Sequence, residues 1–282
     1  KKKELMMKKL LCMLSLVFSL PLCAHQTDTH IFKGKKTAIE KPVTVTLPDG
    51  YQDSKKYNVI YVLHGYSGNH SDWTKLTNIE KLADQYDVII VNPDGNFGSW
   101  YLDSDIDKSS QYETYIADDL INYIDSKYST NRSKSGRVIT GLSMGGFGAL
   151  HIAINHPDQF AAVSGISAGV DVRPFSAEFD LGKVLGSYAE NKEKWDSIAI
   201  INNLHKISAG NTAWKKGADT LPIMLDIGVD DFFIEQNRAL HQAMLKMRIR
   251  HDYVERPGIH DWHYWNKVIA YQFLFLTSHM AP

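Results

Sequence analysis

A serine between two glycines is the first feature of this sequence that could perform chemistry. A G-x-S-x-G motif is formed by Gly141, Leu142, Ser143, Met144 and Gly145, with a β-branched run before it and small apolar residues after it. Between a strand and a helix, this motif makes a tight turn that exposes the serine hydroxyl. We therefore predict that Ser143 is a nucleophile and that the backbone N–H of Met144 binds a developing oxyanion.

Such a serine needs a base to remove its proton and a carboxylate to orient that base. Residues 222–228 predict a strand that leads into Asp230 and Asp231, and either aspartate could be the acid. Asp231 is favoured, because one residue of the pair is expected to cap or bend the turn while the next points at the histidine. His260 follows a Pro-Gly pair after the next predicted strand, residues 252–255, and is the predicted base.

A second backbone donor for the oxyanion is expected in the loop after an early central strand. Residues 58–63 predict such a strand, and Gly65 then lets the chain turn so that the N–H of Tyr66 can face the oxyanion. His64 lies at the end of the same strand. It precedes the serine in the chain, which favours a structural hydrogen-bonding role for His64 over that of the base.

No metal and no cofactor are predicted for this chemistry. His260, Asp261 and His263 could offer metal ligands, but they lack the H-E-x-x-H pattern and a further partner nearby. Two aromatic residues, Trp100 and Trp262, are candidates for substrate binding, because rings on loops can stack on a phenolic acyl group or a sugar. Packing at the rim of the fold is the alternative, and the sequence favours neither role.

Strands alternating with helices must position these residues. Short apolar or alternating runs predict strands at residues 43–47, 58–63, 88–91, 138–140, 162–166, 223–227 and 252–255. Helical spacing predicts helices at residues 77–85, 112–127, 145–155 and 235–246, and a final helix that begins near His263. This order predicts an α/β fold with a mainly parallel, doubly wound central sheet flanked by helices.

Two segments call for separate expectations. Residues 43–47 alternate between apolar and polar side chains, as a strand with one solvent-facing side should. Residues 171–221 fit the alternation poorly, and they are expected to form short helices over the upper edge of the sheet. A functional lid and an ordinary crossover both remain open for the second segment.

Residues 1–24 are interpreted as a secretory signal peptide. A basic start precedes a short apolar run, and the run ends near the small residue Ala24. Lipid attachment at Cys23 is the less favoured alternative, because Leu22 is larger than the residue usually found before a lipidated cysteine. Residues 25–282 are predicted to form a single domain that is exported to the periplasm or secreted.

The composition narrows the partners that this domain could have. Both cysteines precede residue 25, so no disulfide and no thiol nucleophile are predicted for the mature chain. The formal net charge is -1 and no basic block stands out, which argues against nucleic acid as a partner. No membrane insertion is predicted once the signal segment is removed, and no oligomeric state is predicted.

Taken together, the motifs resemble the esterase D-like family of α/β-hydrolases. The segments that carry the resemblance include LHGYSGNHSDW, ITGLSMGGFGALHIA, DIGVDDFFIEQNRAL and GIHDWHYWN. The resemblance implies the α/β-hydrolase fold, a triad of Ser143, Asp231 and His260, and oxyanion donors at Tyr66 and Met144. It also favours Asp231 over Asp230, because the acid in this family directly precedes an aromatic residue.

The resemblance implies an exported serine carboxylesterase that works through an acyl-enzyme on Ser143. Glutathione-linked members typically have a cysteine in the oxyanion loop and GHSMGG at the nucleophile, whereas this chain has GYSGN and GLSMGG. Removal of feruloyl or acetyl groups from plant polysaccharides is therefore the expected activity, with a small ester or an acylated polysaccharide as substrate. An S-formylglutathione hydrolase-like thioesterase and an acyltransferase with the same triad are the alternatives. A binding protein on a hydrolase scaffold is disfavoured by the intact triad.

Overall fold

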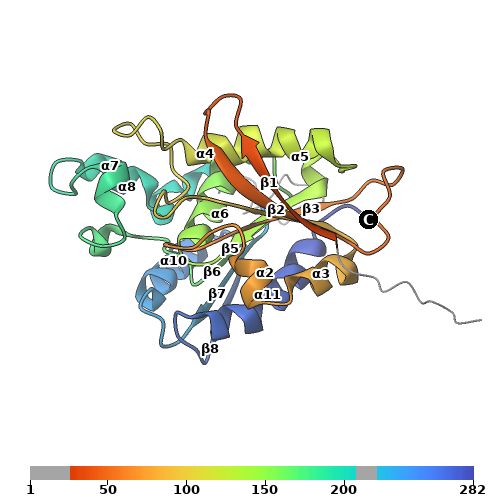
Figure 1. Cartoon of the computed structure of the whole chain (residues 1–282). Coiled ribbons are helices and arrows are strands. Elements are labelled where there is room, and N and C mark those ends of the chain that lie inside the picture. Colours follow the sequence, from red (N-terminus) through yellow and green to blue (C-terminus); the bar gives the residue numbers. More distant parts are fainter. Residues whose placement is uncertain (1–25, 208–220) are drawn as a thin grey trace, which may run out of the picture.

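The computed structural model describes residues 26–207 and 221–282, which form an eight-stranded sheet with helices on both faces (Figure 1). In spatial order the strands are β1 (Gln26–Lys33), β2 (Glu40–Leu47), β4 (Ile89–Pro93), β3 (Val59–Leu63), β5 (Arg137–Gly141), β6 (Ala162–Ile166), β7 (Ile223–Gly228) and β8 (Asp252–Arg256). The first two strands are antiparallel to their neighbours, and the six from β4 to β8 are parallel. This is the predicted α/β-hydrolase architecture.

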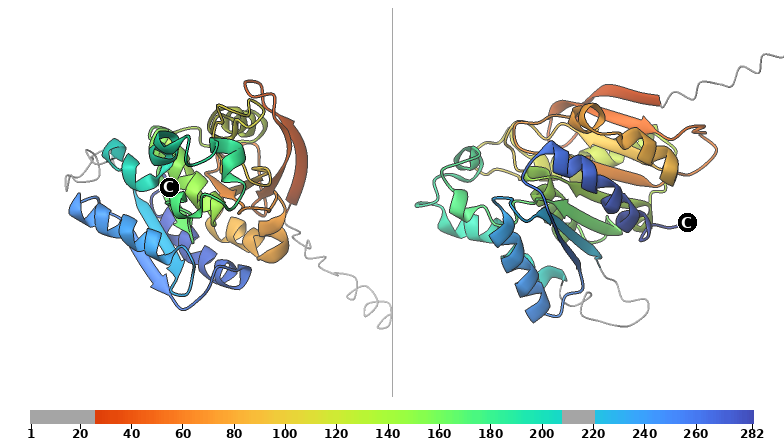
Figure 2. Two further views of the ribbon diagram at one scale, coloured as in Figure 1. Left: turned by 90° about the vertical axis from the view of Figure 1, so that its left-hand side faces the viewer. Right: turned by 90° about the horizontal axis from the view of Figure 1, so that it is seen from below.

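The central strands are buried because helices cover both of their faces (Figure 2). One face packs against α2 (Asp72–Leu76), α3 (Ile79–Tyr86) and α11 (Trp262–Thr277). The other packs against α4 (Tyr112–Thr114), α5 (Ile121–Lys127), α6 (Met144–Asn155) and α10 (Ile234–Lys246). Alternate residues of β3 show the division, since Ile60 belongs to the first core and Tyr61 to the second. A buried parallel sheet explains the continuous apolar runs in the sequence.

Short helices connect β6 to β7, as expected for residues 171–221. They are the 3₁₀ turns Arg173–Phe175 and Ile200–Asn203 and the helices α7 (Leu181–Leu185) and α8 (Lys192–Ile198), at the left of Figure 1. The indole of Trp195 in α8 is fully buried and belongs to the larger core. The described part of this connection is therefore a packed part of the fold, while residues 208–220 lie outside the described residues.

The strand predicted at residues 43–47 exists, but the prediction that one of its sides faces solvent is wrong. Thr44 and Thr46 are buried, and their hydroxyls are hydrogen-bonded to Thr29 and Thr27 of β1 at 3.0 and 3.1 Å. The residues of β1 are mostly exposed and contain no apolar run, so this strand was not predicted. The polar side of β2 is thus paired with the edge strand β1 and with His70, whose Nδ1 lies 2.7 Å from the Thr44 hydroxyl oxygen.

The helix predicted at residues 112–127 is not a continuous α-helix. A π-helical turn, Tyr115–Leu120, separates α4 from α5. Within this turn the Asp119 carboxylate accepts hydrogen bonds from the backbone N–H groups of Lys36 and Thr37 at 2.9 and 3.0 Å. The turn therefore ties the helix to the loop between β1 and β2, a long-range contact that helical spacing does not reveal.

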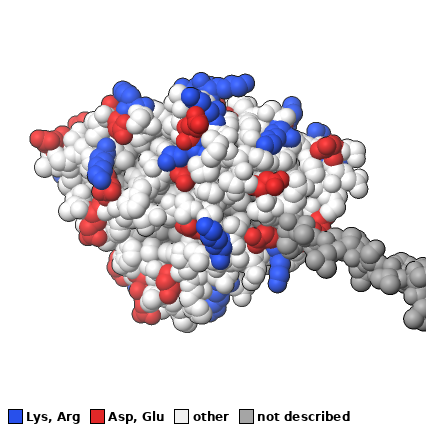
Figure 3. All heavy atoms as spheres, in the orientation of Figure 1, with Lys and Arg blue, Asp and Glu red and all other residues white. Residues whose placement is uncertain are grey.

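The described surface has no strongly charged region on the face shown in Figure 3. Positive and negative side chains are interspersed over the face shown in Figure 3, in keeping with the small net charge. No helix among the described residues is long and apolar enough to cross a bilayer. The signal peptide predicted for residues 1–24, together with Cys23, lies outside the described part of the chain.

Candidate active site

Ser143 lies in a strained turn between β5 and α6. Its backbone has φ 54° and ψ -117°, a left-handed region that non-glycine residues rarely adopt. The turn is held by the Ser143 N–H, which donates to the carbonyl of Ile166 at 2.9 Å. Gly145 is required here, because a Cβ on it would lie 2.5 Å from the carbonyl oxygens of Leu63 and His64. The turn is therefore built against the end of β3, as the motif predicts.

A continuous hydrogen-bonded series joins the serine to a carboxylate. The Nε2 atom of His260 is 2.9 Å from the Ser143 hydroxyl oxygen, and its Nδ1 atom is 2.8 Å from Oδ2 of Asp231. The Asp231 side chain is fully buried, and its other oxygen accepts the N–H of Phe233 at 2.9 Å. The His260 side chain keeps 12% of its surface exposed. The three predicted residues, from loops after β5, β7 and β8, therefore meet in one place.

The structure distinguishes Asp231 from the other aspartates. Asp230 is exposed, and its backbone N–H donates to the carbonyl of Gly258 at 3.0 Å, so it belongs to the turn. Asp226 lies within β7 and is buried, and it accepts a hydrogen bond from the Tyr264 hydroxyl at 2.5 Å. Burial raises the pKa of Asp226, although the hydrogen bond from Tyr264 and the nearby Arg256 oppose that shift. Only Asp231 reaches the histidine.

The two predicted oxyanion donors lie beside the nucleophile. Gly65 is packed against the turn, since a Cβ on it would be 3.5 Å from the Cβ of Ser143. Among the described residues, neither the N–H of Tyr66 nor that of Met144 donates to another protein group. Met144 is also the first residue of α6, whose amino end favours negative charge. Two free N–H groups beside the serine are what a tetrahedral oxyanion requires.

Trp100 is not placed to stack on a substrate. Its side chain is 1% exposed, its Nε1–H donates to the carbonyl of Phe179 at 3.1 Å, and its ring packs edge-on against Phe147. Its backbone N–H also contacts the sulfur of Met144 at 3.4 Å. Trp100 therefore has the packing role that the sequence left open. It packs against Met144, one of the two predicted oxyanion donors.

Trp262 is half-buried at the start of α11. Its ring packs edge-to-face against Trp73 and Trp265, with centroids 5.2 Å away in both cases. Trp265 in turn packs edge-on against His260 at 5.0 Å. Trp262 thus belongs to the aromatic packing behind the histidine, and its contacts are with the smaller core.

A row of aromatic rings other than Trp100 and Trp262 borders the site. It consists of Phe97, Tyr66, Phe179 and Phe232, which we call the aromatic arc. Successive ring centroids are 4.9, 5.5 and 6.1 Å apart, and Phe232 lies 4.2 Å from His260. Its two ends are open to solvent, since Phe97 is 52% and Phe232 47% exposed. The one local signal for Phe232 is its position directly after the acid.

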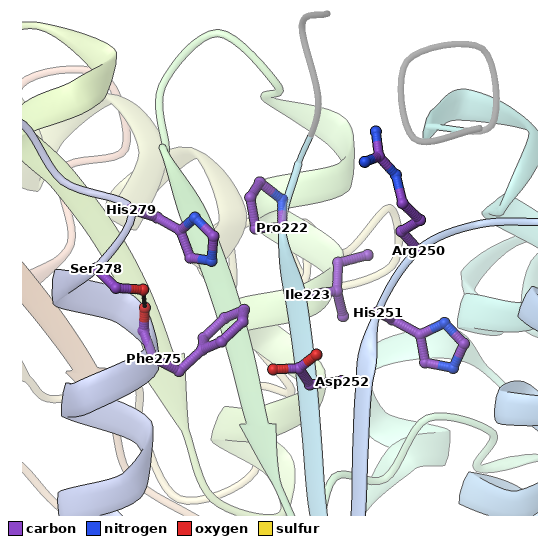
Figure 4. A pocket seen from close by; sticks show the side chains of 8 residues that line it. All are labelled: Pro222, Ile223, Arg250, His251, Asp252, Phe275, Ser278 and His279. Atoms are coloured by element: carbon purple, nitrogen blue, oxygen red, sulfur yellow. Dashed lines mark hydrogen bonds between the residues drawn. The ribbon is translucent and has the colours of Figure 1, made fainter. Parts of the chain in front are cut away.

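A separate cavity of about 470 Å³ lies at the other end of the strands. Figure 4 shows Pro222 and Ile223 at the start of β7, Asp252 at the start of β8, and His279 beyond α11. Because the triad follows the carboxyl ends of the strands, this cavity is not part of it. No group of three metal-ligating side chains occurs among the described residues, and His263 is exposed.

The sequence of this chain is similar to those of known esterases. The model of the Esterase family ("Putative esterase") matches residues 35–276. An acetyl esterase from Caldicellulosiruptor saccharolyticus is 30% identical over 251 residues, a match that covers 86% of this chain and 94% of the relative.

Solved structures of esterases and related hydrolases are also similar to this chain. A ferulic acid esterase superposes with a TM-score of 0.76 and 25% identity, over 91% of this chain and 99% of that one. The S-formylglutathione hydrolase of Staphylococcus aureus superposes with a TM-score of 0.77 over 90% of this chain and 99% of its own. At 19% identity, this superposition shows that the two proteins share a fold.

Proposed function

Since this chain belongs to the Esterase family and is an ester-hydrolysing serine hydrolase, we propose that Ser143, His260 and Asp231 carry out the hydrolysis. The observation that carries the assignment is the series of contacts at 2.9 and 2.8 Å from the serine through the imidazole to the carboxylate. A buried carboxylate bonded to Nδ1 leaves Nε2 free to accept the serine proton.

The proposed reaction is acyl transfer in two steps. His260 takes the proton of Ser143 as the serine oxygen attacks the ester carbonyl, and the N–H groups of Tyr66 and Met144 stabilise the oxyanion. His260 then protonates the departing alcohol, which leaves an acyl-enzyme on Ser143. In the second step a water molecule, deprotonated by His260, attacks this ester. His260 then returns the proton to the Ser143 oxygen as the acid is released.

The proposed substrates are feruloyl or acetyl esters of plant polysaccharides. The similarity to an acetyl esterase and to a ferulic acid esterase supports these two acyl groups. The open ends of the aromatic arc, Phe97 and Phe232, support a substrate with ring faces, either a phenolic acyl group or a sugar. Site residues suited to stacking are more informative here than the fold, which hosts many chemistries.

Two alternatives use the same triad. Thioester hydrolysis is supported by the fold shared with an S-formylglutathione hydrolase. Acyl transfer to a sugar or lipid alcohol would replace water in the second step. Adding an alcohol acceptor during turnover distinguishes transfer from hydrolysis, because only a transferase forms the new ester in preference to the acid.

The proposal also includes export, from the composition of residues 1–24. Sequencing the amino terminus of protein recovered from outside the cytoplasm tests it. A mature chain that begins at His25 supports signal cleavage after Ala24. Lipid on Cys23 would contradict cleavage after Ala24 but not export, whereas an uncut chain in the cytoplasm would contradict export.

The central experiment is hydrolysis of a substrate panel with matched variants. Methyl ferulate, acetylated xylan, p-nitrophenyl acetate and S-formylglutathione are compared, with Ser143→Ala as the inactive form. Ser126→Ala, at an exposed serine on α5, is the control and should retain wild-type rates. We expect kcat to fall by roughly 10⁴-fold or more in Ser143→Ala, together with loss of fluorophosphonate labelling. Equal rates in the two variants would refute the assignment, and a preference for the thioester would refute the substrate.

A further inference from the structure

The imidazole of His64 is buried beside the oxyanion loop without touching the triad. It lies directly after β3 and is 1% exposed. We propose that His64 is a positioning residue that sets the direction of the Tyr66 N–H and so completes the oxyanion site. The inference rests on the proposed function, because it assigns a role within the same reaction.

The hydrogen bonds of His64 fix which ring nitrogen carries the proton. The backbone N–H of Gly95 donates to Nε2 at 2.8 Å, so Nε2 is unprotonated. The proton of the neutral ring is therefore on Nδ1, which lies 2.7 Å from the carbonyl oxygen of Gly65 and donates to it. Burial lowers the pKa of His64, which keeps the ring in this neutral form.

The bond to Gly65 controls the next N–H because both belong to one peptide unit. In a planar trans peptide, the carbonyl oxygen of Gly65 and the N–H of Tyr66 point in opposite directions. The same oxygen also accepts the N–H of Gly68 at 3.1 Å, so two donors hold it on one side. The N–H of Tyr66 must then point to the other side, away from His64.

His64 is itself fixed relative to the nucleophile. The Tyr101 hydroxyl donates to the His64 carbonyl oxygen at 3.1 Å, and Gly145 of the serine turn packs on that same oxygen. Gly65 also lies against Ser143, since a Cβ on Gly65 would be 3.5 Å from the Ser143 Cβ. His64 therefore contacts three loops: its ring is bonded to those after β3 and β4, and its carbonyl oxygen lies against the serine turn after β5.

Two substitutions separate the two hydrogen bonds of the ring. In His64→Asn, the amide nitrogen occupies a place near Nδ1 and can still donate to Gly65, while the acceptor for Gly95 is lost. In His64→Gln, the longer side chain can still accept from Gly95, while the donor to Gly65 is lost. His263→Asn, at an exposed histidine, is the matched control.

The test measures kcat and KM on p-nitrophenyl acetate, the affinity of a boronic acid that forms a tetrahedral adduct, and the melting temperature. We expect His64→Gln to lose about 10- to 100-fold in kcat and a similar factor in boronate affinity, with KM unchanged, because a misdirected donor costs at most what a lost donor costs. His64→Asn should stay within about fivefold of the wild type. Equal kcat values in the two variants, or a rise in KM alone, would overturn the proposal.

The structure of His64→Gln separates this inference from the proposed function. A turned Gly65–Tyr66 peptide supports the role of His64 even if the wild-type protein hydrolyses none of the esters, a result that would count against the function alone. An unmoved peptide overturns the inference even if the wild type is active. If both variants fail to fold, the ¹⁵N shifts of His64 in the wild type test the proposal instead. A proton on Nδ1 supports the proposed role of His64, and a proton on Nε2 overturns it.

Discussion

The ring of Phe232 lies against the imidazole of His260, with the two centroids 4.2 Å apart and the planes inclined by 39°. In the proposed reaction His260 gives its proton to the departing alcohol, so the alcohol must leave on the side of this histidine. Phe232 is 47% exposed, and Ile259, next to the histidine in the chain, is 52% exposed. An apolar border therefore faces the alcohol part of the ester.

Phe232→Ala should reduce the preference for esters with a ring-containing alcohol. We expect KM to rise about 2- to 12-fold for an acetylated sugar or an aryl acetate, because a ring contact contributes about 0.5–1.5 kcal/mol. Methyl and ethyl esters should change less than about twofold. Steady-state kinetics on matched acetates measures this, with Leu274→Ala, at an exposed residue of α11, as the control. A similar rise in KM for esters of small and large alcohols would contradict a contact between Phe232 and the alcohol.

Asp231→Asn and Asp230→Asn should differ strongly although the two residues are adjacent. Asp231 is bonded to Nδ1 of His260, whereas Asp230 is exposed in the turn. Replacing Asp231 favours the wrong tautomer, so we expect kcat to fall about 10³- to 10⁴-fold. Asp230→Asn should stay within about twofold of the wild type. Comparing kcat for the two purified variants decides, and a larger loss in Asp230→Asn would contradict the assignment of the acid.

Gly145→Ala tests the close packing of the serine turn. The added Cβ would lie 2.5 Å from two backbone oxygens, those of Leu63 and His64, which cannot move aside independently of the strand. We expect the free energy of unfolding to fall by about 1–3 kcal/mol and the activity of the folded protein to fall as well. Urea denaturation and kcat measure the two effects.

Gly182→Ala is the control for that substitution. Gly182 lies in α7, and a Cβ there would meet no atom within 4 Å. Alanine should stabilise this helix by up to about 1 kcal/mol and leave kcat unchanged. If both alanine variants lost the same stability, the packing of Gly145 would not be the cause.

His64 should make folding stability depend on pH. Its pKa in the folded protein is lowered from 6.5 by burial, so the unfolded chain binds a proton more readily. Its contribution is therefore present above about pH 6.5 and is lost as the pH falls. The difference in unfolding free energy between the wild type and His64→Asn should therefore be smaller at pH 5.5 than at pH 7.5. Urea denaturation at both pH values measures it, and a constant difference would show that His64 is not held neutral.

The sequence was sufficient for the parts of the site that depend on local chain geometry. Ser143 and His260 each occupy a turn with its own glycine and follow a recognisable strand. The choice between Asp230 and Asp231 was harder, because it depends on which side chain turns inward after β7. The order of strands and helices could be read from apolar runs because a parallel sheet buries both faces.

The rest depends on contacts between segments far apart in the chain. Trp100 is buried because Phe179, 79 residues later, covers its indole. Phe232 is exposed and adjacent to the base only because β7 and β8 are neighbours in the sheet. Thr44 looks like a surface residue until Thr29 of β1 and His70 are placed beside it. Periodicity reports a strand's own pattern and contains no information about such neighbours.

The position of β8 has a consequence for how the enzyme loses activity. It is the last strand of the described sheet and pairs with β7, while the serine turn is anchored by the fully buried strands β3 and β5. Edge elements open more often than central ones, by local unfolding that leaves the remaining structure intact. Detachment of β8 would remove His260 while Ser143 stays in place. Inactivation by heat or denaturant should therefore precede the loss of the central sheet, and backbone amides of β8 should exchange hydrogen faster than those of β5.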